Sequence, residues 1–133
     1  MIIDLLPGAK TDLRALRESN PDAFAAVMAF LEEAEADESL IDKFTTYGNV
    51  QIGESVINVK RWAAASVVGN LLRIRILNPP ATVYRIVYGY DWQTRRMGIL
   101  AVVHKDDFDY EIKGELADRI QNDWYVATDG RST

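Results

Sequence analysis

The sequence predicts an α+β domain in which helices pack on one face of a small antiparallel sheet. Three observations lead to this class: helical hydrophobic spacing in the N-terminal half, a change to a period of two in the middle, and apolar residues spaced by four near the end. The 133 residues fit a single domain with one modest core. We therefore expect one domain over 1–133, with a helical part over about 1–55 and the sheet and a C-terminal helix over about 56–127.

The N-terminal half begins with a short apolar segment and continues with two helix signals. Residues 2–6 predict a short strand ended by the turn pair Pro7-Gly8, and Thr11 is a candidate N-cap for a brief helix. Asn20-Pro21 is a stronger start signal, because Asn caps well and the first helical turn does not use the amide hydrogen that Pro lacks. The helix that follows has one apolar face, formed by Phe24, Val27, Met28 and Leu31.

The middle of the chain has the alternation of β-strands. Residues 71–77 (LLRIRIL) and 83–90 (VYRIVYGY) alternate, and 97–104 (MGILAVVH) has the continuous apolar run of a strand buried on both sides. Residues 56–60 predict a further strand or an extended connection. The sheet is therefore expected to have three to four strands, antiparallel with a mixed edge, followed by a helix that places Ile112, Leu116, Ile120 and Trp124 on one face.

Composition excludes several kinds of site. The chain has no cysteine, which rules out a disulfide, a thiolate metal site and a cysteine nucleophile. It has no glycine-rich phosphate loop, metal-ligand cluster or nucleophile elbow, so we expect no metal and no cofactor. No apolar stretch approaches the ~20 residues of a membrane span, and the early Asp4 argues against a secretory signal. These features predict a cytoplasmic protein without a membrane partner.

Charge is distributed unevenly along the chain. The whole chain has a net charge of −5, yet residues 60–105 contain eight Lys or Arg and a single acid, Asp91. A basic middle between acidic ends predicts a local anion-binding face on an acidic body. The alternative is that arginines merely occupy a solvated face of the strands.

Arg73, Arg75 and Arg85 can project from one sheet face if the two strands pair in the right register. Guanidinium groups bind phosphate in a bidentate manner and stay charged at cellular pH. His104 and Lys105, at the end of the last strand, and Tyr110 beyond it are candidates for proton transfer and base stacking.

Each of these candidates has a structural alternative. A lone histidine at a strand end more often serves as a structural hydrogen-bonding group, and Tyr110 can simply anchor the last helix. The aromatic residues Trp62, Trp92 and Trp124, and the tyrosines opposite the arginines, are interpreted as packing residues.

The succession NLLRIRI, VYRIVYGYD and MGILAVVHKDDFDYE resembles the RelE/ParE toxin superfamily of type II toxin-antitoxin systems over roughly residues 57–124. The resemblance implies a RelE-like fold and a toxin that cleaves mRNA on the ribosome without a metal. In that chemistry the 2′-hydroxyl of the RNA attacks the adjacent phosphate, and basic residues stabilise the transition state. The implied partners are a cognate antitoxin, the ribosome and mRNA; the oligomeric state stays open.

The resemblance also implies roles for individual residues. Arg85 matches the arginine that grips the phosphate, His104 or Lys105 a proton-transfer group, and Tyr110 a C-terminal tyrosine that stacks or aids proton transfer. Arg73 and Arg75 match paired basic residues that bind RNA, while Arg61 has no counterpart in the motif and is a candidate RNA contact only. The alternatives are a ParE-like gyrase inhibitor, a decayed toxin that only binds protein, and an unrelated α+β interaction domain.

Overall fold

The computed structural model describes residues 2–37, 41–52, 55–61, 71–107 and 114–130. The strands in this part are β1 (Ile2–Leu5), β2 (Gly48–Ile52), β3 (Ser55–Arg61), β4 (Leu71–Ile76), β5 (Tyr84–Asp91) and β6 (Arg96–His104). The α-helices are α1 (Pro7–Ser19), α2 (Pro21–Glu35), α3 (Ile41–Phe44) and α4 (Glu115–Ala127), with short 3-10 helices η3 (Ala81–Val83) and η4 (Lys105–Asp107).

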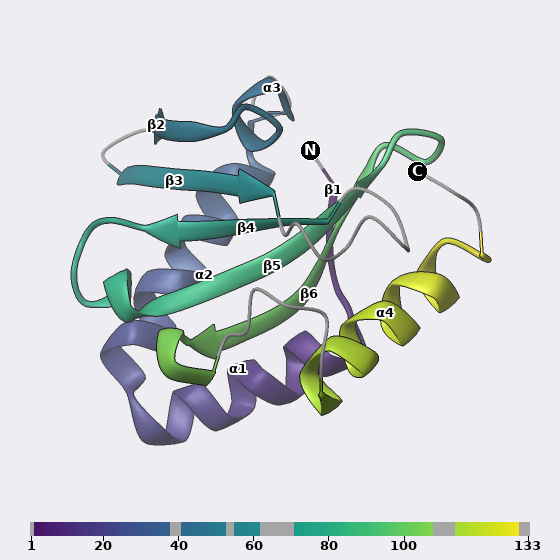
Figure 1. Ribbon diagram of the computed structural model, residues 1–133. Coiled ribbons are helices and arrows are strands. Elements are labelled where there is room, and N and C mark those ends of the chain that lie inside the picture. The colour runs from purple at the N-terminus through teal and green to yellow at the C-terminus, as the bar shows by residue number, and fades with distance from the viewer. Residues whose placement is uncertain (1, 38–40, 53–54, 62–70, 108–113, 131–133) are drawn as a thin grey trace.

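The six strands form one sheet in the order β1-β6-β5-β4-β3-β2 (Figure 1). Strand β1 pairs in parallel with β6, and every other neighbouring pair is antiparallel. The class is α+β, but the predicted sheet of three to four strands is wrong, because the sheet has six. Strand β2 is the one the sequence pattern did not indicate. It falls within the stretch expected to be helical, and its sequence GNVQI has only two apolar residues.

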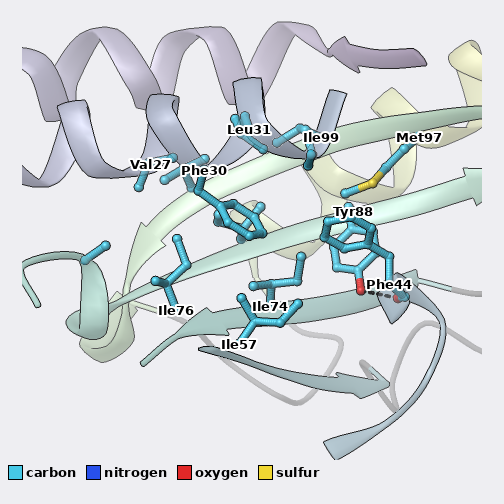
Figure 2. Close-up of a cluster of buried hydrophobic side chains, with 14 of the residues drawn as sticks. Val27, Phe30, Leu31, Phe44, Ile57, Ile74, Ile76, Tyr88, Met97 and Ile99 are labelled. Atoms are coloured by element: carbon cyan, nitrogen blue, oxygen red, sulfur yellow. Dashed lines mark hydrogen bonds between the residues drawn. The ribbon is translucent and has the colours of Figure 1, made fainter. Parts of the chain in front are cut away.

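Helices α1 and α2 cover one face of the sheet, as expected (Figure 1). Figure 2 shows Phe30 and Leu31 of α2 in one cluster with the strand residues Ile74, Tyr88 and Ile99. The cap at Asn20 forms as predicted, with its side-chain oxygen accepting from the backbone N–H of Ala23 at 3.2 Å. The alternation of β5 is also confirmed, since its even-numbered residues lie in this core.

Tyr88 is buried at the centre of this core. Its hydroxyl donates to the backbone carbonyl of Phe44 (Figure 2), and its ring meets that of Phe44 edge-on at 6.2 Å. Burial raises the pKa of Tyr88 above its ordinary value, although the positive charge of Arg73 opposes this shift. The hydroxyl is therefore neutral in the folded protein and ties α3 to the sheet.

Replacing Tyr88 with phenylalanine is expected to destabilise the fold by about 1–2 kcal/mol at pH 7, because the Phe44 carbonyl loses its partner. Since the folded pKa of Tyr88 lies above the unfolded value, wild-type stability is fully present below pH ~10 and is lost as the pH rises beyond it. Urea unfolding at pH 7 and pH 11 tests both statements. The Tyr88→Phe variant should lose less stability between the two pH values, and an equal loss in both proteins would contradict the assignment.

Helix α4 packs on the opposite face of the sheet over a small second core. Trp124 lies on two glycines that pair across β5 and β6: a Cβ at Gly89 would stand 2.7 Å from the indole, and one at Gly98 would stand 2.8 Å from it. Because neither glycine has a side chain, the indole can pack directly against the backbone of β5 and β6.

Strand β6 contains a bulge that reverses which of its residues face which way. Tyr88 pairs with Ile99 and Val87 pairs with Ala101, so Leu100 is an extra residue. Before the bulge, odd-numbered residues such as Met97 and Ile99 face α1 and α2; after it, the even-numbered Val102 does. The direction of every side chain from 101 to 104 depends on this insertion.

Helix α1 starts four residues before the predicted cap. Pro7 is its first residue, where Pro is favoured, and Thr11 lies inside the helix with its hydroxyl donating to the Pro7 carbonyl. Leu6 supplies no side-chain cap. Instead Asp123 of α4 accepts from the Gly8 N–H at 3.0 Å, which places a carboxylate at the positive end of the α1 dipole.

A second link between α1 and α4, the ion pair of Asp12 and Arg119, also binds the edge of β6. Strand β1 ends at Leu5 opposite Ile99, so beyond this point the edge of β6 has no strand neighbour among the described residues. The Asp12 carboxylate accepts from the Val102 N–H at 2.9 Å and receives both terminal nitrogens of Arg119, at 3.0 and 2.8 Å. The Asp12 carboxylate, held by Arg119, thus satisfies one backbone N–H on this edge of β6.

Candidate anion-binding site

The register brings four cationic residues onto one face of the sheet, the face that also carries α4. Arg75 lies directly opposite Arg85 across β4 and β5, and Lys60 lies opposite Arg73 across β3 and β4. Because side chains alternate along a strand, Arg73, Arg75 and Arg85 share this face, as the sequence predicted. We refer to Lys60, Arg73, Arg75 and Arg85 as the cationic face.

The four cations differ in exposure. Lys60 and Arg75 are exposed, whereas Arg73 is 5% and Arg85 9% exposed. The Nη1 of Arg85 donates to the carbonyls of Thr82 and Tyr84, at 3.0 and 3.3 Å. These bonds hold the Arg85 guanidinium beside the start of β5.

Arg73 is held by the neighbouring strand. Its Nη1 donates to the backbone and side-chain oxygens of Asn58, at 3.2 and 3.0 Å. The Asn58 amide in turn donates to the Asn49 side chain on β2 at 2.8 Å. A polar row across three strands therefore fixes the position of Arg73.

Two arginines directly opposite one another are unfavourable for the fold. Like charges at opposed positions of an antiparallel pair repel, and no described residue forms an ion pair with Arg75 or Arg85. Packing alone therefore gives no reason for this pair. A bound anion would relieve the repulsion, because one phosphate group can accept from two guanidinium groups.

His104 lies on the other face of the sheet, away from Arg75 and Arg85. It pairs with Tyr84, and the two rings meet edge-on at 5.6 Å. Its Nδ1 accepts from the Asp106 N–H at 3.1 Å and lies 3.4 Å from the Asp106 carboxylate. The structure therefore does not bring His104 together with the arginines.

The remaining predicted site residues are also dispersed. Lys105 is exposed at the start of η4, directly after His104. Arg61 is exposed at the end of β3, opposite Leu72 of β4, on the side away from the cationic face. Tyr110, like Trp62, lies outside the described residues.

A metal-binding cluster and a membrane-crossing helix are both absent from the part of the chain that the structure describes. Among its His, Asp and Glu side chains no group of three is arranged to hold a metal ion. Within the same residues, no helix has both the length and the apolar composition that a membrane crossing requires.

A shallow groove lies between α1, α2 and β1. It has a volume of about 250 Å³, with Leu13, Phe24 and Met28 among its apolar lining residues. Its cationic lining residues, all from α1, are Lys10, Arg14 and Arg17. Such a groove suits an amphipathic segment with acidic side chains.

Sequence reasoning missed an aromatic pocket at the end of the sheet near the β5–β6 turn. Trp92 was interpreted as a packing residue, but its side chain is 55% exposed, whereas Trp124 is buried as expected. Trp92 lines this pocket with Tyr47, Tyr90 and Arg61. The signal available in the sequence was the position of Trp92 in a polar turn (DWQTRR), where a large apolar side chain has little core to enter.

Comparison with known proteins gives no relative: no family model, no curated protein and no solved structure matches this chain. The geometry of the cationic face therefore has to be interpreted on its own.

Proposed function

We propose that this protein is the toxin of a type II toxin-antitoxin system and that it cleaves mRNA during translation in the cytoplasm, without a metal. The observation that carries the proposal is the opposed pair Arg75 and Arg85, with Lys60 and Arg73 in the next row of the same face. The resemblance of residues 57–124 to RelE/ParE toxins supplies the reaction.

In the proposed reaction the 2′-hydroxyl oxygen attacks the adjacent phosphorus, and the bond from phosphorus to the 5′ oxygen breaks. The 2′ oxygen loses a proton, the leaving 5′ oxygen gains one, and the product has a 2′,3′-cyclic phosphate end. Hydrolysis of this ring by water gives a 3′-phosphate end. Negative charge accumulates on the phosphoryl oxygens in the transition state. The guanidinium of Arg75 is exposed and can bind these oxygens directly, while the buried Arg85 adds a fixed positive charge beside it.

The experiment is induction of the full-length protein in cells, with growth as one readout and mapping of RNA ends as the other. The wild type should arrest growth and produce cleavage within translated codons. Arg75→Ala and Arg85→Ala should each reduce cleavage by roughly 10²–10³, the loss typical for removing one group that stabilises charge in a transition state. Arg96→Ala, which removes an exposed arginine at the start of β6, is the matched control and should cleave as the wild type does.

His104→Ala separates geometry from resemblance. The resemblance predicts that this change abolishes cleavage, whereas the position of His104 on the opposite face predicts less than a tenfold effect. Thermal unfolding of each variant shows whether the fold is intact. Normal growth and intact messages in cells that contain folded wild-type protein without antitoxin would refute the nuclease proposal.

A second candidate is a non-nucleolytic toxin that acts by binding a protein such as gyrase. The separation of His104 from the arginines favours it, as does the bonding of Arg73 and Arg85 to oxygens of the protein itself. This candidate predicts growth arrest with a DNA-damage response and no new RNA ends in the same induction assay.

Both candidates include an acidic antitoxin as partner. Its acidic segment would neutralise the cationic face, and an amphipathic part would fill the groove between α1 and α2. Ribosome and mRNA are the further partners of the nuclease.

A further inference from the structure

The aromatic pocket lies at the other end of β4 from Arg75. It has a volume of about 160 Å³ and is open to solvent, with Leu72 of β4 and Tyr90 of β5 among its buried lining residues. Tyr47 and Trp92 line it as well, with 61% and 55% of their surfaces exposed. Two large aromatic side chains that are exposed at one cavity are unusual for a surface without a ligand.

The Trp92 ring is held in place rather than free to collapse. It meets Tyr90 edge-on, with ring centroids 4.5 Å apart and an angle of 80° between the planes. The turn that carries it is fixed by Asp91, whose side chain accepts from the Gln93 N–H and whose carbonyl accepts from the Arg95 N–H. The Trp92 ring can therefore stack on a ligand with little loss of conformational entropy.

The charge at the pocket selects the ligand. Arg61, exposed at the end of β3, is a cationic lining residue, and no acidic residue is among the described lining. The pocket therefore suits a planar ring that carries a negative group. A nucleotide has both, since its base stacks on aromatic rings and its phosphate binds guanidinium.

The pocket is also connected to the cationic face. Strand β2 begins at Gly48, opposite Val59, so the next residues of β3, Lys60 and Arg61, extend past it at the edge of the sheet. Lys60 belongs to the cationic face, whereas its neighbour Arg61 lines the pocket. These two consecutive cations can carry a phosphate backbone around the edge from one face to the other.

We propose that the pocket formed by Tyr47, Tyr90, Trp92 and Arg61 binds one nucleotide of single-stranded RNA, with the base against Trp92 and the phosphate on Arg61. The choice of RNA as the strand rests on the proposed function, but the site itself is defined by binding and not by cleavage. The same chemistry would also accept a free nucleotide.

The test is a binding titration of the full-length protein with two kinds of probe. One is AMP or UMP, and the other is an eight-nucleotide 2′-O-methyl RNA, which lacks the attacking hydroxyl and cannot be cleaved. Tryptophan fluorescence reports on Trp92, and anisotropy of the labelled oligonucleotide gives the affinity. We expect quenching on binding, and a roughly 5- to 100-fold weaker affinity for Trp92→Ala, as for loss of one stacked base. Arg61→Gln should lower the salt dependence of oligonucleotide binding by about one ionic contact.

Matched controls are Tyr125→Ala, which removes an exposed aromatic ring on α4, and Arg96→Gln, which removes an exposed arginine at the start of β6. Tight binding of AMP or UMP alone would support the site with a free nucleotide as ligand, and a marked preference for the oligonucleotide would support a strand. Affinity unchanged by Trp92→Ala and Arg61→Gln, or no binding of either probe, would overturn the proposal. If Arg75→Ala abolishes cleavage but leaves binding in the aromatic pocket intact, the nuclease function and the nucleotide site are independent of each other.

Discussion

Replacing Trp124 with alanine is expected to destabilise the protein by about 3–5 kcal/mol, the range for removing a large aromatic side chain from a core. The indole is 2% exposed, and it fills the space above Gly89 and Gly98. Its loss removes the contact of α4 with these two glycines of β5 and β6. Denaturant unfolding followed by far-ultraviolet circular dichroism measures the effect.

The fit between the indole and the two glycines can be tested by compensation. Gly98→Ala alone introduces a methyl group 2.8 Å from the Trp124 ring and is expected to cost about 1–3 kcal/mol by overpacking. With Trp124→Leu in the same chain, the added methyl should cost less or even stabilise. Additive effects of the two changes would mean that the ring does not rest on this glycine.

Replacing Asp12 with alanine is expected to cost about 2–3 kcal/mol, below the range for a fully buried ion pair because Arg119 is 33% exposed. The change leaves both the Arg119 guanidinium and the Val102 N–H without the carboxylate. Chemical unfolding gives the loss of stability. Hydrogen exchange should show faster exchange at Val102 than in the wild type.

The control for Asp12 is a second ion pair between residues distant in the sequence, Asp4 and Arg96. Asp4 and Arg96 are 3.2 Å apart, but both side chains are more than 40% exposed. Asp4→Ala should therefore change stability by less than about 1 kcal/mol. If the two aspartate variants lose the same free energy of unfolding, the bonds of Asp12 to Arg119 and Val102 stabilise the fold no more than an exposed ion pair does.

The face of the sheet on which each arginine lies could be predicted because β4 and β5 alternate without interruption over the paired residues. Leu72 and Ile74 go to the core and Arg73 and Arg75 to the other side, and their register with β5 agrees with this pattern. The position of His104 could not be predicted in the same way. Strict alternation from Met97 would place it with the arginines, and the extra residue Leu100 moves it to the opposite face.

The bulge has no signature in the sequence. The run MGILAVVH is apolar on both sides of the strand, so a shift of one residue still leaves apolar side chains on both faces. The hydrophobic pattern therefore specifies that the strand is buried but not where its parity changes. Strand β2 left no periodic signal for a different reason, because it lies at a sheet edge and has few apolar residues.

The exposed aromatic pocket shows a different limit. The apolar character of Trp92 favours burial, whereas its position in a polar turn favours exposure. Its actual position depends on where the β5–β6 turn ends relative to α3 and β2, which are distant in the sequence. Only the assembled sheet brings Tyr47 and Trp92 to one cavity.

The parallel pairing of β1 with β6 also determines how late the protein can fold. Ile2 pairs with Arg96, and Asp12 binds Arg119, so the first strand and helix depend on residues near the end of the described chain. Contacts of such long sequence separation form slowly, because a long loop must close before they contribute. During synthesis the N-terminal segment therefore stays incomplete until α4 has been made.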